Sequence, residues 1–247
     1  MSVEKERNSL KSFIPIWTKY EHEERYDFAT LYVNNKLVVD CACGNGSGTK
    51  KYCQGNPKFI NAFDISNEAV LEAKEINKNE KNIKIEVADG TNLKLEDNYS
   101  DLFISFETIE HIDEDNKFLE EVYRVTNQDG MFICSTPNRS VTNPGKKIKN
   151  KPWNKYHIRE YSKEEFVNLI SEKFKIIEIY GQNKVNKKIN KIKNFVGKIL
   201  PFHFVVRINQ LIKLMGMLFE KRIKHKVELV DEKYDYEYLI IVAKPKK

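Results

Sequence analysis

The sequence is poor in cysteine and lacks long apolar segments. It contains four cysteines in 247 residues, which at these spacings do not form a disulfide framework and fit a reducing compartment. Residues 1–11 are charged and polar, and no apolar stretch follows them that would form a secretory signal or a membrane-spanning helix. We therefore predict a cytoplasmic protein.

Neither a metal nor a nucleic acid is the expected ligand. A zinc site made from Cys41, Cys43 and Cys53 would lack a second paired cluster, so we predict no metal site. The net charge is +6, but its excess lies mostly in residues 146–226 and 244–247, and the first 140 residues are close to balanced. The charge alone is therefore weak evidence for a polyanionic partner.

Short apolar runs alternate with amphipathic segments from Lys36 onward, a pattern typical of β–α–β units and a parallel sheet. The length and the 40% hydrophobic content favour one elaborated domain. The seven runs predicted as strands are residues 37–41, 59–63, 83–87, 102–106, 131–134, 176–180 and 238–242. Helical spacing predicts helices at residues 68–77 and 118–125, and a capping box of Ser162 and Glu165 predicts one ending at Ile170. The expected fold class is α/β, with a doubly wound, mostly parallel sheet.

These segments predict three parts of the chain. Residues 1–35 would form an N-terminal helical cap, and residues 36–182 with 236–247 would form the α/β domain. Residues 183–235 would be a helical insertion used for acceptor binding or oligomerisation. Residues 138–160, rich in proline, glycine and lysine, are expected to be a mobile loop near the active face.

A glycine-rich turn joins the first predicted strand to a helix. Residues 38–49 read VVDCACGNGSGT, and glycines there let the backbone adopt positive φ and approach a ligand closely. An ordinary strand-to-helix turn would look similar. The dinucleotide fingerprint G-x-G-x-x-G is less well matched, because Gly44 and Gly46 are followed at the third position by Thr49.

An aspartate lies at or just after the end of each of the first three predicted strands: Asp40, Asp64 and Asp89. Because parallel strands present their carboxyl ends to one crevice, these carboxylates are expected to converge. Asp64 could accept hydrogen bonds from ribose hydroxyls and Asp89 from an adenine amino group, while Asp40 could help to hold an α-amino group. Each acid alone could equally be a helix cap or turn former. Together they suit a zwitterionic, adenosine-bearing ligand without phosphate.

The pattern D-x-A-C-G-x-G-x-G at residues 40–48, followed by FDIS at 63–66 and ADG at 88–90, resembles the class I S-adenosylmethionine-dependent methyltransferases. The resemblance implies S-adenosyl-L-methionine as cofactor, S-adenosyl-L-homocysteine as product, and a seven-stranded sheet with an antiparallel last strand. The family usually has glycine where this chain has Ala42; alanine is small and suits negative φ, so we expect a minor effect. The residues expected to bind the cofactor are Tyr20, Arg25, Asp40, Cys41, Ala42, Gly44, Gly46, Asp64, Ile65, Asp89, Gly90, Phe106 and Glu107.

Further segments resemble a bacterial branch of that superfamily whose members are commonly associated with modification of cell-surface sugars. They are FETIEHI at 106–112, STPN at 135–138, YHIREY at 156–161 and EHEERYDFA at 21–29. The resemblance implies methyl transfer to a hydroxyl, or to an amine, of a small polar acceptor such as a sugar, a nucleotide-sugar or a capsule or surface-glycan precursor.

The candidate catalytic residues are His111, His157 and Glu107. A hydroxyl acceptor must lose a proton, and imidazole titrates near neutrality. Two other roles remain open for the histidines, because His111 could cap a helix and His157 could pack a loop. Glu107 and Glu110 are alternative bases, and either could instead bind the cofactor's amino group or a substrate hydroxyl.

Residues 191–226 combine apolar side chains with many cations. Such a segment could contact an anionic membrane peripherally, form a homodimer face, or simply pack on the domain. Three further functions therefore stay open: a methyltransferase for a lipid-linked or quinone-like acceptor, a non-catalytic cofactor-binding partner subunit, and an RNA methyltransferase.

Overall fold

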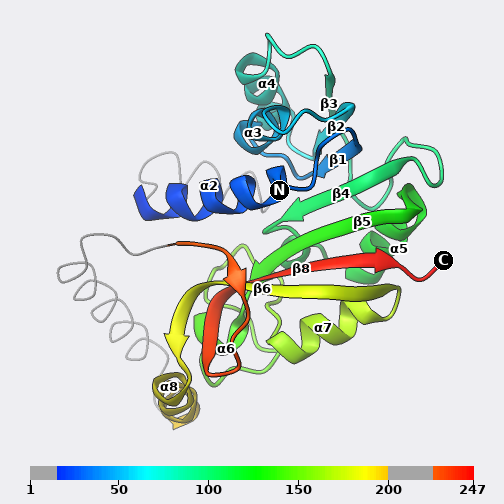
Figure 1. The fold of residues 1–247 in the computed structure, drawn as a ribbon. Coiled ribbons are helices and arrows are strands. Elements are labelled where there is room, and N and C mark those ends of the chain that lie inside the picture. Colours follow the sequence, from blue (N-terminus) through cyan, green and yellow to red (C-terminus); the bar gives the residue numbers. More distant parts are fainter. Residues whose placement is uncertain (1–15, 200–224) are drawn as a thin grey trace.

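The computed structural model describes residues 16–199 and 225–247, which form one mixed sheet with helices on both faces (Figure 1). The strands are β1 (Leu37–Cys41), β2 (Phe59–Asp64), β3 (Ile83–Val87), β4 (Ser100–Phe106), β5 (Thr126–Pro137), β6 (Phe174–Asn186), β7 (Glu228–Leu229) and β8 (Tyr234–Pro245). The helices are α2 (Ile16–Thr30), α3 (Ser47–Cys53), α4 (Asn67–Ile76), η1 (Ile109–His111), α5 (Asp115–Val125), α6 (Arg139–Thr142), α7 (Lys163–Ser171) and α8 (Lys187–Ile199).

The strand order is β3-β2-β1-β4-β5-β8-β6-β7. Strands β1 to β5 pair in parallel, and β8 lies antiparallel between β5 and β6. The α/β fold class and the antiparallel last strand are thereby confirmed, and all seven predicted strands are present. The described residues contain an eighth strand, β7, which pairs only two residues with β6 and is too short to show a periodic pattern.

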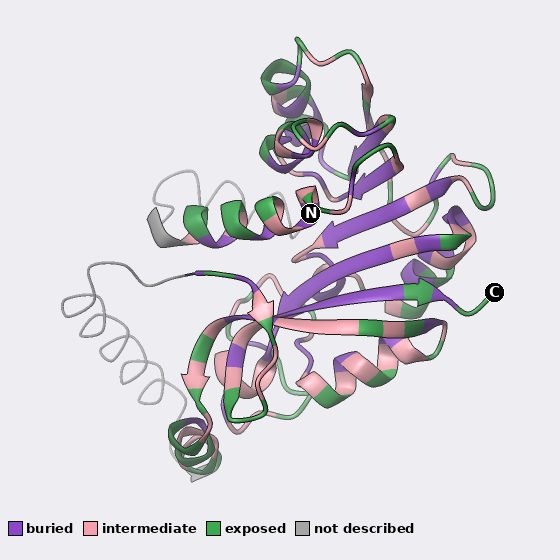
Figure 2. Cartoon of the chain, viewed as in Figure 1, coloured by how far each residue is buried: buried purple, intermediate pink, exposed green. Residues whose placement is uncertain are grey.

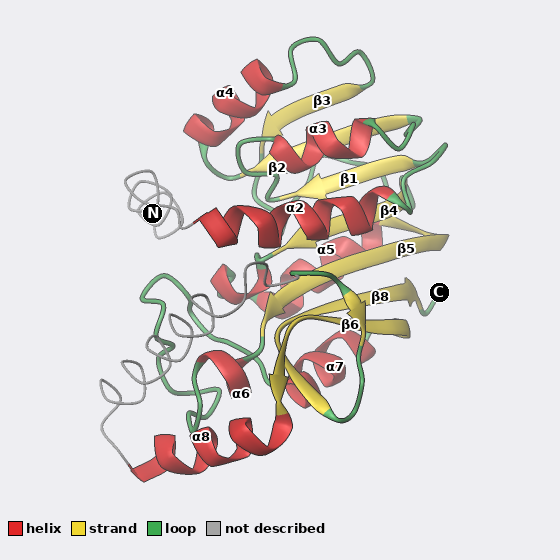
Figure 3. Cartoon of the chain, turned by 60° about the vertical axis from the view of Figure 1, so that its left-hand side comes forward, coloured by secondary structure: helices red, strands yellow, loops and turns green. Residues whose placement is uncertain are grey.

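Side chains from the strands point alternately to the two faces of the sheet. Val39, Phe103 and Phe132 pack with the apolar residues of α5 and α7. Their neighbours Val38 and Leu102 point the other way, into a second cluster with α2, α3 and α4. Figure 3 shows α2 and α3 in front of the sheet and α5 behind it. Because both faces are covered, the central strands are almost continuously buried (Figure 2).

The predicted helices lie within two or three residues of the observed ones. The helix predicted at residues 68–77 is α4, and the helix predicted at 118–125 is α5, which begins at Asp115. The capping box is present in both halves: Ser162 accepts from the Glu165 amide, and the Glu165 side chain accepts from the Ser162 amide.

The segment predicted as a helical insertion is described only in part. Strand β6 continues to Asn186 before α8 begins, so residues 183–186 of this segment belong to the sheet. Most of the mixed apolar and basic stretch at 191–226 lies outside the described residues. Within the described ranges, no helix is both long and apolar enough to cross a membrane.

Candidate active site at the carboxyl ends of the strands

The three aspartates predicted to converge meet beside the end of β1. Strands β1, β2 and β3 are parallel neighbours, so the residues at their carboxyl ends lie side by side. Burial raises the pKa of the Cys41 thiol, and the charges of Asp40, Asp64 and Asp89 raise it further. Gly90, next to Asp89, is so close that a Cβ there would lie 2.9 Å from Cys41 Sγ. We call the region between these carboxylates the cofactor crevice.

Asp64 connects the second strand to the glycine-rich turn. Its Oδ2 accepts a hydrogen bond from the Gly44 amide at 2.9 Å, and its Oδ1 accepts from the Ser66 amide at 2.9 Å. Ser66 in turn caps α4 through the Ala69 amide. The neighbouring Ile65 is exposed, so an apolar surface lies beside this carboxylate. Asp89 is exposed and accepts two hydrogen bonds from Thr91.

The expectation that Ala42 adopts negative φ is wrong. Its φ is 64°, close to the values of Gly44 (63°) and Gly46 (77°), so three residues of this turn lie in the left-handed region. For an L-residue with a Cβ that conformation costs about 1–2 kcal/mol. The course of the backbone through the turn requires positive φ at residue 42. The small side chain of alanine does not remove the resulting strain.

We therefore predict that Ala42→Gly stabilises the protein by about 1 kcal/mol, because glycine adopts positive φ without steric cost. Urea unfolding of the wild type and the variant measures the difference. Ala69→Gly is a matched control, because Ala69 is buried within helix α4 and the same change there should destabilise by about 1 kcal/mol. A loss of stability in Ala42→Gly would contradict the observed backbone.

Asp40 is almost fully buried and accepts a hydrogen bond from Thr49 Oγ1 at 2.7 Å. Burial raises the pKa of Asp40 to about 7; the Thr49 hydrogen bond opposes this shift, and the charge of Asp64 adds to it. A positively charged ligand group in the cofactor crevice would favour the ionised form of this carboxyl. Thr49 occupies the position where the dinucleotide fingerprint has glycine, and in this chain its hydroxyl is the donor to Asp40.

The raised pKa of Asp40 makes stability depend on pH. The pKa of Asp40 in the folded protein lies above the unfolded value of about 3.9. Its contribution to the free energy of unfolding is therefore fully present below pH 4 and is lost as pH rises through 7. Asp40→Asn removes this titration while keeping an acceptor for Thr49. The free energy of unfolding of the variant, minus that of the wild type, should therefore increase by about 2 kcal/mol from pH 5 to pH 7. Urea unfolding at both pH values checks this, and an unchanged difference would contradict it.

Helix α2 covers the glycine-rich turn from one side. Tyr26 packs on Gly48, where a Cβ would approach the ring to 2.7 Å, and contacts Phe106 at a ring distance of 6.4 Å. Arg25, expected to bind the cofactor, is only 1% exposed and donates hydrogen bonds to Gln182 and His22. Tyr20 is 49% exposed. The structure thus gives Arg25 protein partners that hold α2 against the sheet.

Glu107 follows β4 at the edge of the cofactor crevice. Its φ of 49° is unusual for a residue with a side chain, and such strain persists where surrounding contacts enforce it. Those contacts come from Ser135, whose Oγ donates to Glu107 Oε1 at 2.7 Å while Ser135 O and Oγ accept from the Glu107 amide. Burial raises the pKa of Glu107, and the charge of Arg25 opposes the shift.

The structure brings the two candidate histidines together with Glu110. The rings of His111 and His157 lie 4.7 Å apart in an edge-to-face arrangement. Glu110 is fully buried, and burial together with the neighbouring charge of Glu107 raises the pKa of Glu110 to about 8. We call Glu110, His111 and His157 the Glu–His cluster.

Backbone hydrogen bonds hold the two segments of the Glu–His cluster in register. The Glu110 carbonyl accepts from the amides of Ile158 at 2.9 Å and Arg159 at 3.4 Å. Glu160, which the sequence analysis did not single out, lies 2.7 Å from His157 Nδ1 through its Oε1 and accepts from Asn143 at 2.6 Å through its Oε2. Two sequence signals mark Glu160: it lies three residues after His157, and it belongs to the YHIREY segment at 156–161.

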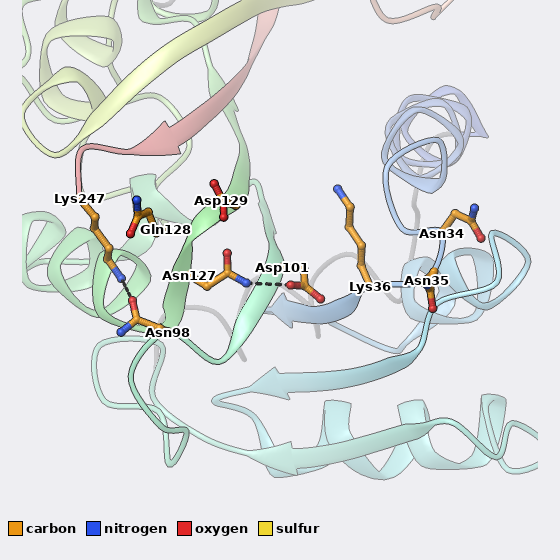
Figure 4. A pocket seen from close by; sticks show the side chains of 9 residues that line it. All are labelled: Asn34, Asn35, Lys36, Asn98, Asp101, Asn127, Gln128, Asp129 and Lys247. Carbon is orange, nitrogen blue, oxygen red and sulfur yellow. Dashed lines mark hydrogen bonds between the residues drawn. The ribbon is translucent and has the colours of Figure 1, made fainter.

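A polar hollow of about 860 Å³ lies away from the carboxylates of the cofactor crevice, and Figure 4 shows the side chains that line it. It is lined by Asn34, Asn35, Lys36, Asn98, Asp101, Asn127, Gln128, Asp129 and Lys247. Lys36 precedes β1 and Asp101 is the second residue of β4, so this hollow is at the amino ends of the strands. Open α/β sheets bind their ligands at the carboxyl ends. We therefore place the candidate site at the cofactor crevice.

The family model described as "Methyltransferase domain" matches residues 39–134, which run from within β1 into β5 and include the cofactor crevice, Glu110 and His111. Residues 39–134 are thus similar to a methyltransferase domain. A Mycolicibacterium smegmatis protein named "Probable S-adenosylmethionine-dependent methyltransferase" is 27% identical over 150 residues, covering 60% of this chain and 55% of the relative. A similarly named Mycobacterium tuberculosis protein is 29% identical over 133 residues, covering 54% and 46%. The chain thus spans about half the length of these curated relatives.

The chain also has the fold of solved S-adenosylmethionine-dependent methyltransferases. One from Thermotoga maritima superimposes with a TM-score of 0.62 at 15% identity, covering 99% of both chains. At this identity the likeness shows the fold. Proteins of this fold and family use S-adenosylmethionine and yield S-adenosylhomocysteine.

The residues of the cofactor crevice fit that cofactor. Its carboxylates provide acceptors for ribose hydroxyls and amino groups, and their negative charge suits a ligand with an ammonium and a sulfonium. The same charge would repel the phosphates of a dinucleotide. Among the described residues, the gathered set of potential metal ligands does not include Cys41, Cys43 or Cys53.

Proposed function

We propose that this protein transfers a methyl group from S-adenosylmethionine to a hydroxyl of a small polar acceptor, such as a sugar, a nucleotide-sugar or a surface-glycan precursor. The observation that carries the methyl-transfer part is the position of Asp40, Asp64 and Asp89 at the neighbouring ends of β1, β2 and β3, within the residues that match the methyltransferase model. The acceptor class is supported by the sequence resemblance to enzymes of surface sugars. The free state of all four cysteines fits a cytoplasmic location.

In this proposal the crevice residues bind and orient the cofactor. Asp64 would accept from the ribose hydroxyls, Asp89 from the adenine amino group, and Asp40 would face the α-amino group. The cofactor supplies an electrophilic methyl group. Because methyl transfer is an in-line displacement, the protein's main task is to hold the acceptor in line and to exclude water.

The acceptor's proton needs a base near the end of β4. Glu107 and the Glu–His cluster lie there, next to the crevice and partly or fully buried. A buried group positioned within hydrogen-bond reach of a hydroxyl can take its proton as the methyl group is transferred. This placement favours a hydroxyl acceptor over one that reacts without losing a proton.

Isothermal titration with S-adenosylhomocysteine, alongside the same titration with NAD, tests the cofactor. We expect micromolar binding of S-adenosylhomocysteine and none of NAD, because the crevice has carboxylates where a dinucleotide needs a phosphate cradle. The protein would next be incubated with S-adenosylmethionine labelled in its methyl group and a panel of nucleotide-sugars and glycan precursors. Binding of NAD alone would refute the proposal.

A further inference from the structure

The Glu–His cluster gathers three potential metal ligands beside the cofactor crevice. Glu110 and His111 come from η1, and His157 comes from the segment before α7. One ligand atom from each lies within 4.8 Å of the other two, and no other set of this kind occurs in residues 16–199 or 225–247. Bonds of about 2.0–2.2 Å place ligands of one ion roughly 3–4 Å apart, so small side-chain shifts would close the site.

Glu110 has an unsatisfied oxygen at this position. Its Oε2 accepts a hydrogen bond from Thr136 at 3.0 Å, but its Oε1 is buried and has no hydrogen-bond partner among the described residues. Burying a carboxyl oxygen without a partner costs free energy, and the cost is larger when the group is ionised. A cation bound to Oε1 would remove that cost.

Both imidazoles are oriented through Nδ1. His157 Nδ1 is 2.7 Å from Glu160 Oε1, and His111 Nδ1 is 3.3 Å from the Tyr156 carbonyl oxygen. Because these oxygens accept, each neutral ring carries its proton on Nδ1 and its lone pair on Nε2. The Asn154 amide nitrogen donates to His157 Nε2 at 2.9 Å, as that tautomer requires, so Asn154 must turn away for this nitrogen to bind an ion. Metal-bound histidines are commonly held by a carboxylate or a carbonyl in this way.

We propose that Glu110, His111 and His157 bind a divalent transition-metal ion, of the Zn²⁺ or Mn²⁺ type, which holds the acceptor's hydroxyl oxygen beside the cofactor crevice. Two imidazole nitrogens and one carboxylate oxygen suit such ions and leave coordination positions open. Binding to the ion lowers the pKa of the hydroxyl, whose O–H bond breaks as the proton passes to the Glu107 carboxylate. The acceptor role rests on the proposed function, whereas metal binding does not.

Cobalt(II) is the probe for this site, because its visible absorption reports nitrogen and oxygen ligation. The purified chain, freed of metal with EDTA and dialysed, would be titrated with Co²⁺. We expect visible bands that saturate at one ion per chain, and an affinity at least 10-fold lower in Glu110→Gln and in His157→Ala. His225→Ala is the matched control, because His225 bonds Asn183 outside the cluster and should leave the bands unchanged.

The outcomes separate this inference from the proposed function. Glu110→Gln is nearly isosteric, and thermal melts of each variant confirm that it is folded. Absent bands in the wild type, or equal Co²⁺ affinity in the folded variants, would overturn the metal site. S-adenosylhomocysteine binding in the presence of EDTA is measured separately. This measurement tests the cofactor assignment independently of metal binding.

Discussion

Asp64→Ala is expected to weaken S-adenosylhomocysteine binding by roughly 10-fold or more. A hydrogen bond to a charged acceptor contributes about 1.5–3 kcal/mol, and Asp64 would make such bonds to the ribose. The same carboxylate holds the Gly44 amide at 2.9 Å, so its removal also loosens the turn that faces the ligand. Isothermal titration of the folded variant measures the change, and unaltered affinity would remove the cofactor assignment.

Two further variants make the result specific. Asp64→Asn keeps the size of the side chain but not its charge, so it should also weaken binding if ionised oxygens contact the ribose. Asp129→Ala is the matched control away from the cofactor crevice, because Asp129 is exposed and lines the hollow of Figure 4. A loss of affinity in Asp129→Ala, with Asp64→Ala unaffected, would move the ligand to that hollow.

The sheet could be predicted from the sequence because most of its strands are buried on both faces. Such strands are nearly continuous apolar runs, and each predicted run lies inside an observed strand. The polar ends were missed: β5 begins five residues earlier than predicted, at Thr126, and β6 extends to Asn186. Polar residues at a strand end carry no periodic signal, and β7 is too short to carry one.

The site was predictable in part. The aspartates could be placed because strand ends of a parallel sheet share one edge. The positive φ of Ala42 could not be predicted, because the course of the backbone through the turn, and not the residue type, determines it. The contact between His157 and Glu110 depends on two amides after His157 that bind the Glu110 carbonyl, and no local pattern encodes such a long-range pairing. The hydrogen bond from Arg25 to Gln182 could not be predicted, because the two residues are 157 positions apart in the sequence.

His157→Ala is expected to slow methyl transfer by about 10²–10⁴-fold with S-adenosylhomocysteine affinity unchanged. A general base contributes that much to the rate. Loss of a metal ligand at the same position would remove activation of the same hydroxyl. The rate of S-adenosylhomocysteine formation would be measured with an acceptor found in the panel, and His225→Ala would serve as the histidine control. A near-native rate in folded His157→Ala would exclude it from the reaction.

The two roles of His157 predict different responses to a chelator. If His157 only takes a proton, EDTA leaves the wild-type rate unchanged, and the ring acts through the nitrogen that now faces Asn154. If His157 holds a metal ion, EDTA abolishes the wild-type activity, and adding Zn²⁺ or Mn²⁺ restores it in the wild type but not in His157→Ala. The unpartnered Oε1 of Glu110 favours the second result, because a proton-transfer role for His157 gives that buried oxygen no partner among the described residues.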